Sequence, residues 1–382
     1  LTRGKKDCLS YFCRRQLSQT LITIIITKMN SGNYTSEAVS ILKSLIEIPS
    51  TSRNEEHASD FIANTLGKYG LIFERIGNNI LSKNSDFNDK KPTLLLNAHI
   101  DTVKPTKSWN RDPFAATIEG DKLFGLGSND CGGGVVSTLM TYIYLSQREQ
   151  SYNLLWLASA EEEVSGENGI RMVIPSLPKI DIAIVGEPTG MQPAIAEKGL
   201  LVIDAIAHGV SGHAARDGGV NAIYKALEDI NTIKSFKFKK NSELLGPTKM
   251  TVTIINAGTQ HNVIPDECKF TIDIRTNEKY TNEEIYNILL KHLQSDLNAR
   301  SFRLSSSHID ENTVIIKRCK ELGMKPFGSP TLSDQALMPF PSFKLGPGES
   351  IRSHSADEFI LISEIDNAIK TYIKLLDGMD II

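Results

Sequence analysis

Two kinds of hydrophobic pattern alternate along the chain. Between Ala38 and Ile46 apolar residues recur every three or four positions, which predicts an amphipathic helix that Pro49 ends. Further helices are expected over about 59–69 and 132–146. Short runs that are apolar at nearly every position predict buried strands: LIFERIG, NILSKN, TLLLNAHI, NLLWLASA and DIAIVGE. Such strands, separated by helices, indicate a mostly parallel sheet covered by helices on both faces.

The order of predicted strands and helices changes after Gln192. GLLVIDAIAHG reads as a strand, NAIYKALEDINTI as a helix, KMTVTIINAG and CKFTIDIRT as two strands, NEEIYNILLKHLQ as a helix and ARSFRLS as a last strand. This order is that of a ferredoxin-like α+β unit. We therefore predict an α/β fold with a mixed, mostly parallel sheet, formed by residues 29–193 and 307–382, with a ferredoxin-like domain inserted over residues 194–306.

The first 28 residues differ from the rest of the chain. They hold six basic residues and one acidic residue, and their apolar stretch LITIIIT is too short to span a bilayer. Met29 begins a pattern typical of an amphipathic helix. We expect residues 1–28 to be a non-native or disordered leader upstream of the true start; a targeting segment is the alternative.

Composition excludes some classes of function. The 382 residues are 40% hydrophobic and 23% charged with a net charge of −3, which is typical of a globular protein and gives no electrostatic footprint for nucleic acid. No segment is long and apolar enough to predict a membrane span. Five scattered cysteines without a CxxC spacing favour free thiols in a reducing compartment, so we expect a cytoplasmic protein.

Acids and histidines stand where predicted strands and loops end. His99 and Asp101 end one apolar run, Glu161 to Glu163 end the next, and Glu187 ends a third. Asp130 lies in a glycine-rich loop before a helix, and His354 lies near the chain end. Each has an ordinary explanation alone, such as a helix cap or a surface turn. Together they predict one cleft, because ligands gather outside the carboxyl ends of parallel strands.

The residue types point to a divalent metal. Two imidazoles with several carboxylates suit zinc or a similar first-row ion. We expect His99 to bind the ion while the Asp101 carboxylate accepts its other ring N–H and fixes the tautomer. Among the three consecutive glutamates, one is expected to bind metal and another to activate water.

Five ordered motifs resemble those of the co-catalytic zinc aminoacylase, carboxypeptidase and deacylase family: HIDTVKP, GLGSNDCGGG, ASAEEEVSG, VGEPTG and RSHSADEF. The resemblance extends from Met29 onward. Within the family, the motifs are most similar to those of N-acylornithine deacetylases of arginine biosynthesis. It implies two zinc ions per subunit, for which cobalt substitutes. The implied roles are His99 and Glu187 on one ion, Glu163 and His354 on the other, Asp130 bridging, Glu162 as general base and Asp101 supporting His99.

The sequence leaves two parts of this assignment open: the register of the three glutamates and the number of ions bound. The motif reads AEEE where the family more often has ADEE, so a slip of one residue would make Glu161 the base and Glu162 the ligand. Cys131 follows Asp130, but we do not make it a ligand because the oxygen and imidazole set is already complete. The number of ions bound under working conditions is also open.

The resemblance extends to substrate contacts. It implies that residues 194–306 form a dimerisation or lid domain, and that His213 reaches the active site of a partner in a homodimer. It also implies substrate-binding roles for Asn262, Arg275 and the KLGPGES loop around Gly346. For Arg275 an interface salt bridge is an equal alternative.

The expected activity is metal-dependent removal of the N-acyl group from a small N-acyl amino acid. N-acetylornithine is the main reading, with N-succinylornithine or N-acetylcitrulline beside it. Succinyl-diaminopimelate desuccinylase or a dipeptidase is the alternative within the same family. A non-catalytic metal protein would not need the Glu162 base, and CGGGVVS lacks the lysine and spacing of a phosphate loop.

Overall fold

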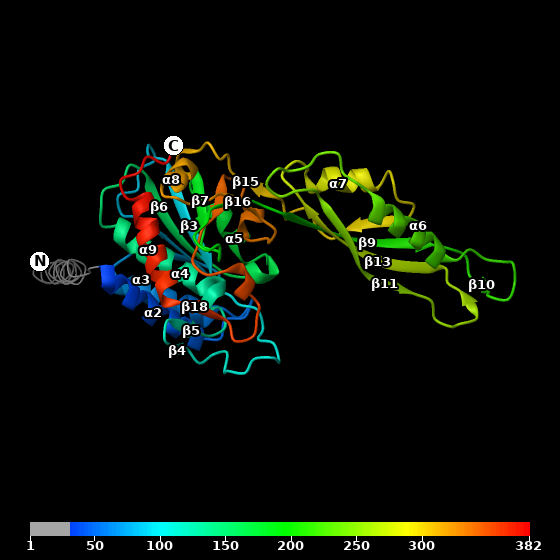
Figure 1. Ribbon diagram of the computed structural model, residues 1–382, viewed down its shortest axis with the longest axis horizontal. Coiled ribbons are helices and arrows are strands. Elements are labelled where there is room, and N and C mark those ends of the chain that lie inside the picture. The colour runs from blue at the N-terminus through cyan, green and yellow to red at the C-terminus, as the bar shows by residue number, and fades with distance from the viewer. Residues whose placement is uncertain (1–30) are drawn as a thin grey trace, which may run out of the picture. The chain divides into compact units, whose positions relative to one another are not determined.

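The computed structural model describes residues 31–382, so the expected leader lies outside the described part. The chain divides into two units (Figure 1). The first runs to Pro193 and adds Glu311–Lys325 and Lys344–Ile382; the second comprises Ala194–Asp310 and Pro326–Phe343. No helix among residues 31–382 is both long and apolar enough to cross a membrane.

The first unit is built on a mixed sheet. Strand β3 pairs in parallel with both β6 and β7, whereas β2 pairs antiparallel with β6 and β1 with β2. All seven residues of β3 and of β6 are buried, which explains why both strands are apolar at most positions. The neighbours in order are β1 (Phe73–Ile76), β2 (Asn79–Lys83), β6 (Asn153–Ser159), β3 (Thr93–His99) and β7 (Ile182–Val185).

Helices cover this sheet. Helix α4 contacts β3 and β6, and α2, α4 and α9 pack against one another (Figure 1). Every residue of α4 except Tyr144 is buried, as expected of a helix that is apolar all round. The helices of this unit are α2 (Ser31–Glu47), α3 (Glu56–Lys68), α4 (Gly133–Leu145), α5 (Ile170–Val173), α8 (Val314–Glu321) and α9 (Ile362–Leu376). A small sheet adds β4 (Thr117–Glu119), β5 (Lys122–Phe124) and β18 (Phe359–Leu361).

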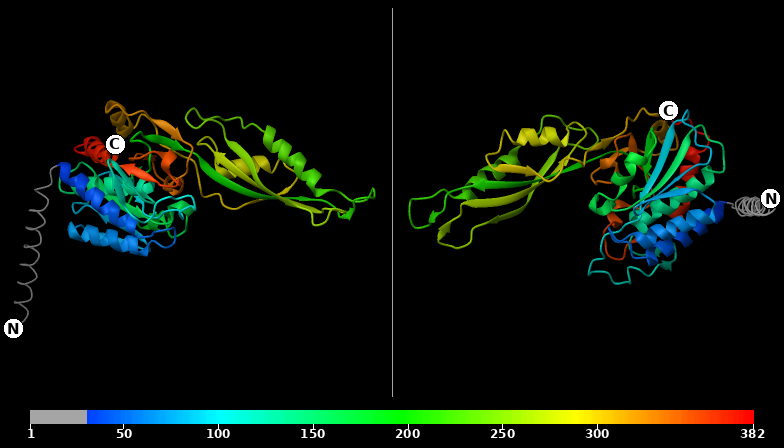
Figure 2. Two further views of the ribbon diagram at one scale, coloured as in Figure 1. Left: turned by 60° about the horizontal axis from the view of Figure 1, so that its bottom comes forward. Right: turned by 180° about the vertical axis from the view of Figure 1, so that it is seen from behind.

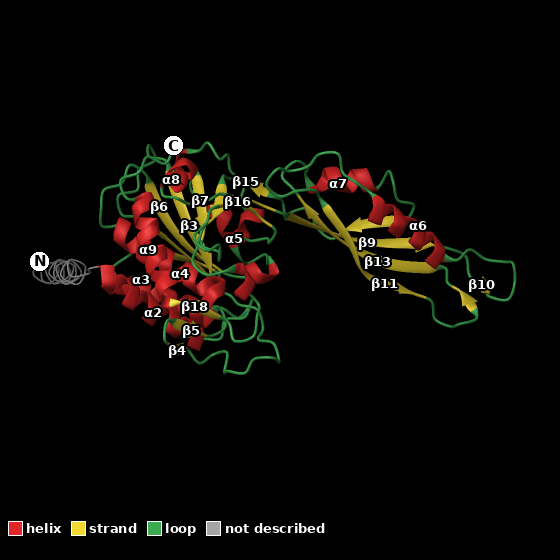
Figure 3. Cartoon of the chain, in the orientation of Figure 1, coloured by secondary structure: helices red, strands yellow, loops and turns green. Residues whose placement is uncertain are grey.

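The second unit contains a four-stranded antiparallel sheet in the order β11-β13-β9-β14. Its helices α6 and α7 cover one face, and their apolar residues form one core with those of β9 and β13 (Figures 2 and 3). Thr281 and Glu284 form a capping box at the start of α7. The element order is the predicted ferredoxin-like one: β9 (Gly199–His208), α6 (Ala222–Ser235), β11 (Lys249–Ala257), β13 (Glu267–Thr276), α7 (Asn282–Leu289) and β14 (Asp296–Ala299).

One boundary differs from the expectation. The sequence pattern placed residues 307–382 together in the first unit, but residues 307–310 and 326–343 group with the second. The reason is backbone pairing, because β16 (Phe327–Ser329) runs parallel to β8 (Ala194–Glu197) and β15 (Ser307–His308) antiparallel to it. The hydrophobic pattern of these short strands carries no sign of their partner. The unit also contains β10 (Gly212–His213) and β12 (Val263–Ile264).

Candidate metal centre

Parallel strands bring the predicted residues of the first unit to one edge of its sheet. His99 is the last residue of β3, and the turn Glu162–Val164 follows β6 after Ala160 and Glu161. Glu187 lies two residues beyond β7. Because β6, β3 and β7 are neighbours, their carboxyl ends lie side by side. Two loops add Asp130, just before α4, and His354.

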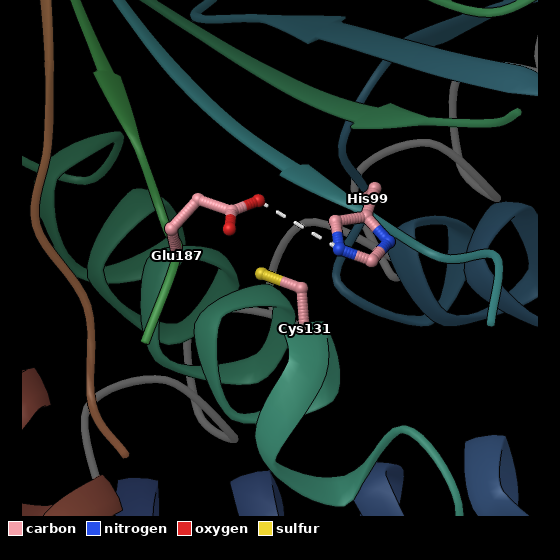
Figure 4. A group of neighbouring side chains, drawn as sticks. All are labelled: His99, Cys131 and Glu187. Carbon is pink, nitrogen blue, oxygen red and sulfur yellow. Dashed lines mark ion pairs between the residues drawn. The ribbon is translucent and has the colours of Figure 1, made fainter. Parts of the chain in front are cut away.

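One group of side chains surrounds His99. Its Nε2 atom lies 3.2 Å from Asp130 Oδ1, 3.7 Å from Glu187 Oε1 and 3.8 Å from Glu162 Oε2. Figure 4 shows the His99 ring and the Glu187 carboxylate turned toward each other, with the Cys131 thiol beside them. A single cation between these atoms would meet nitrogen and carboxylate oxygen, the donor set that zinc accepts.

A second group surrounds His354. Its Nε2 atom lies 2.8 Å from Glu163 Oε2 and 3.7 Å from Asp130 Oδ2. Ligand-type atoms of Asp130, Glu163 and His354 all lie within 4.8 Å of one another. Asp130 therefore turns one carboxylate oxygen to each histidine, which is the geometry needed to bridge two cations.

The Asp101 carboxylate lies beside His99, but it is not the nearest acceptor for the ring N–H. His99 Nδ1 lies 2.9 Å from the main-chain oxygen of Asp101, whereas the carboxylate Oδ1 is 3.5 Å away. A carbonyl only accepts, so Nδ1 carries the hydrogen and Nε2 is left for Asp130 and Glu187. The tautomer is fixed as predicted, but by the backbone, because residue 101 follows directly after the strand and its carbonyl turns back on the ring.

The Asp101 carboxylate instead holds the glutamate turn. Its two oxygens accept from the main-chain N–H groups of Glu162 at 3.0 Å and Glu163 at 3.2 Å, and from the Ser52 hydroxyl at 2.7 Å. Asp101 thus connects the His99 strand end to the turn that carries both glutamates.

The three consecutive glutamates have different environments. Glu161 points away from the histidines, because its carboxylate accepts from the side-chain amide and main-chain N–H of Asn168. Glu162 lies beside His99, and Glu163 beside His354. Glu161 has a positive φ of 53°, so the chain reverses there and separates its side chain from the next two.

The carboxylates around His99 carry the excess negative charge that is typical of a cation site. Burial and the Asp130 carboxylate raise the pKa of Glu187 to about 8 when no cation is present. Its Oε1 atom is buried without a hydrogen-bond partner. Burial alone would lower the pKa of His99, but Glu162, Asp101 and Asp130 raise it well above the usual value. A buried carboxylate oxygen that has no hydrogen-bond partner and is surrounded by other carboxylates is suited to bind a divalent cation.

The Cys131 thiol forms a hydrogen bond to the main chain. Its Sγ donates to the main-chain oxygen of Gly186 at 2.9 Å, and burial raises its pKa well above the usual value. A protonated thiol is a weak ligand. The described residues therefore offer oxygen and imidazole nitrogen for the cations. Cys268 and Cys319 are likewise buried free thiols.

Two buried acids outside the predicted set of site residues bind the loops of the site through hydrogen bonds. Glu55 accepts from the main-chain N–H of Arg53 at 2.6 Å and of Glu161 at 3.2 Å. Glu358 accepts from the loop that carries Asp130. Glu358 follows Asp357 within the last motif, so its position was visible there, whereas nothing in the sequence marks Glu55.

The residues predicted to bind substrate lie in different places. Gly346 packs on the Glu187 loop, where an added Cβ would approach Glu187 O to 2.5 Å. In the second unit, Ala214 N donates to Asn262 O, so His213 and Asn262 are on neighbouring segments. Arg275 pairs with Asp273 of the same strand through two hydrogen bonds, so the interface salt bridge stays a prediction. Their contacts with substrate stay predictions.

Comparison with known proteins identifies the family. The model of peptidase family M20/M25/M40 matches residues 95–378. Succinyl-diaminopimelate desuccinylase of Orientia tsutsugamushi (strain Boryong) is 25% identical, with 88% of this chain and 95% of that protein covered. A probable succinyl-diaminopimelate desuccinylase of Staphylococcus aureus is also 25% identical, with 88% and 97% covered. These names differ from N-acylornithine deacetylase, which the motifs resembled.

Solved structures share the fold. An M20 family metallo-carboxypeptidase from Sulfolobus solfataricus has a TM-score of 0.69 at 20% identity, with 89% of this chain and 99% of that chain covered. A dinuclear metal-binding M20 peptidase from Bacillus subtilis has a TM-score of 0.69 at 17% identity, with 90% and 97% covered. With a family model that matches most of its length and this shared fold, the chain belongs to peptidase family M20/M25/M40.

Proposed function

We propose that this M20 hydrolase cleaves the amide bond of a small N-acyl amino acid with two divalent cations, zinc in the first place and cobalt as a substitute. The observation that carries the proposal is Asp130, which turns one oxygen toward His99 and the other toward His354. His99 and Glu187 would hold one cation, and Glu163 and His354 the other. When bound, such ions lower the pKa of water and polarise a carbonyl oxygen.

Glu162 is the proposed general base. Its carboxylate lies beside His99, and its main-chain N–H is held by Asp101, so its position at the strand end is fixed. Glu162 would accept a proton from the attacking water and return it to the nitrogen of the leaving amine. The contact of the Glu163 carboxylate with His354 supports Glu163 as the ligand, and the bonds of Glu161 to Asn168 argue against Glu161.

The acyl group is a separate question. The motifs resembled N-acetylornithine deacetylases, but the curated relatives quoted above are named succinyl-diaminopimelate desuccinylases. These names support succinyl-diaminopimelate over N-acetylornithine, so we favour the desuccinylase reading, with dipeptides next because several similar structures are peptidases.

A substrate panel tests this proposal. Purified zinc-loaded protein is offered succinyl-diaminopimelate, N-acetylornithine, N-succinylornithine, N-acetylcitrulline and dipeptides, and kcat/KM is compared. Glu162→Gln, purified in parallel, controls for hydrolases of the expression host. We expect succinyl-diaminopimelate to be preferred. Hydrolysis of none of them by the wild-type protein, or equal rates in both preparations, would contradict the proposal.

We also propose a homodimer formed through the second unit. Strand β11 is an edge of its sheet, and Ile254 and Ile255 on it are each 50% exposed. Tyr224 and Leu227 of α6 are also exposed. An exposed apolar edge strand is a template for pairing with a second copy. Sedimentation equilibrium tests this, with Ile255→Lys expected to shift dimer toward monomer; a monomeric wild type would contradict it.

A further inference from the structure

The loop that carries Asp130 is bound to a single residue from the end of the chain. The main-chain oxygen of Glu358 accepts from Gly125 N at 3.0 Å. Its carboxylate Oε2 accepts from Gly127 N at 3.0 Å, and Oε1 accepts from Asn129 N at 2.8 Å and Asp130 N at 2.9 Å. Four hydrogen bonds therefore connect Glu358 to the segment 125–130.

These bonds have no substitute. Glu358 is only 2% exposed, Gly127 and Asn129 are buried and Asp130 is half-buried, so solvent has little access to these amides. A buried N–H group left without an acceptor is unfavourable, because it has lost its hydrogen bonds to water. A carboxylate binds amides more strongly than a neutral acceptor, but burying it is expensive. The chain places this costly group against the one loop that presents Asp130 to both histidines.

Other contacts also restrain this loop. Gly127 adopts a left-handed φ of 74°, and an added Cβ would approach Thr102 to 2.5 Å. The side chain of Asn129 bonds to both main-chain groups of Glu349. The backbone on the N-terminal side of Asp130 is thus held at several points, and the bond to Asp130 N comes from Glu358.

We propose that Glu358 is a positioning residue that sets the Asp130 carboxylate between the two cation positions by fixing the amides of its loop. The inference rests on the proposed cation site. Glu358 touches neither substrate nor cation in this role and acts only through Asp130. Its loss is therefore expected to weaken cation binding, and not merely folding.

Two other acids supply controls. Asp357, the preceding residue, accepts from the main-chain N–H groups of Asn110 and Arg111, which belong to a different loop. In the second unit, the buried carboxylate of Asp229 accepts from Gln294 N, Ser295 N and Ser295 Oγ. Asp229→Asn removes the same kind of bonds without any connection to Asp130, so it measures the purely structural effect.

The test compares cation binding in four full-length proteins: the wild type, Glu358→Gln, Asp357→Asn and Asp229→Asn. Zn²⁺ is titrated into each chelator-treated protein by calorimetry, and the visible absorption of Co²⁺ reports its geometry. The Gln amide would turn a donor toward an N–H donor, so we expect affinity to fall roughly 10- to 100-fold in Glu358→Gln, as for other residues that orient metal ligands. Both controls should keep wild-type affinity.

Wild-type Zn²⁺ affinity and an unchanged Co²⁺ spectrum in folded Glu358→Gln would overturn the inference, whatever its unfolding midpoint. If that variant does not fold, Glu358→Asp replaces it. The shorter side chain keeps a carboxylate but cannot reach all three amides, so affinity should again fall, and wild-type affinity would overturn the inference. A wild type that binds no Zn²⁺ would instead refute the proposed function.

Discussion

His354 Nε2 lies 2.8 Å from Glu163 Oε2, although the two residues are 191 positions apart in the chain. The two partners differ in exposure, since the His354 side chain is 55% exposed and that of Glu163 only 7%. His99, at the other proposed cation position, is 1% exposed. The two positions therefore differ in access to solvent, which bears on how cations leave and return.

Chelation should remove activity in two steps. The cation beside exposed His354 should leave first, and the one beside buried His99 later, because solvent reaches the first more easily. Metal content and turnover are followed during dialysis against a chelator, and zinc or cobalt should restore both. His354→Ala should retain about one cation per chain. Full activity in a preparation verified as metal-free would contradict the cation-dependent mechanism.

Glu162→Ala should abolish turnover while cation content stays at the wild-type value. The substitution removes the proposed base but leaves all five proposed ligands in place, and general bases typically contribute on the order of 10²–10⁴-fold. The measurements are kcat and bound zinc by mass spectrometry. A metal-depleted variant would show instead that Glu162 is a ligand.

Glu161→Gln is the matched substitution one position earlier. Its carboxylate contacts Asn168 rather than either histidine, so the variant should keep its cations and retain kcat within a few-fold. Its amide would oppose the Asn168 donors, which should lower the free energy of unfolding by about 1–3 kcal/mol. Urea unfolding measures this, and loss of catalysis with intact stability would count against the register.

Alkaline pH should destabilise the protein partly through Cys319. Burial raises the pKa of this thiol to about 12 from a usual 9.0. Between those values the unfolded chain loses the proton and the folded chain keeps it, so stability falls as pH rises, by up to about 1.4 kcal/mol per pH unit. Cys319→Ala should lose less stability than the wild type between pH 8 and pH 10.5 in urea unfolding. Equal losses would show that the thiol is not the cause.

His213 should act in the partner's site if the dimer forms as proposed. Glu162→Ala and His213→Ala should each be nearly inactive. In a mixed dimer, the His213→Ala chain keeps its own Glu162 and receives His213 from its partner, so one of the two sites is whole. Co-refolding with differential tags should restore that share of activity. Exchange without recovery would mean that His213 acts in its own chain or not at all.

The sequence by itself determined the main elements and the type of site. Unbroken apolar runs identified β3 and β6 because both faces of these strands are buried. Acids and histidines directly after such runs identified the edge where ligands gather, because parallel strands end together. The ferredoxin-like order was also readable, since β9 alternates between buried and half-buried positions as a strand with one covered face does.

Only the tertiary structure decided which atoms meet. Three identical glutamates in a row have the same chemistry in the sequence, and a reversal of the backbone at Glu161 separates their side chains. The ring of His99 bonds to a carbonyl rather than to the predicted carboxylate, a choice made by the turn after β3. Glu358 reaches its loop across more than 200 residues, and β16 pairs with β8. Long-range contacts of this kind leave no periodic pattern in the sequence, because they depend on how separate segments pack.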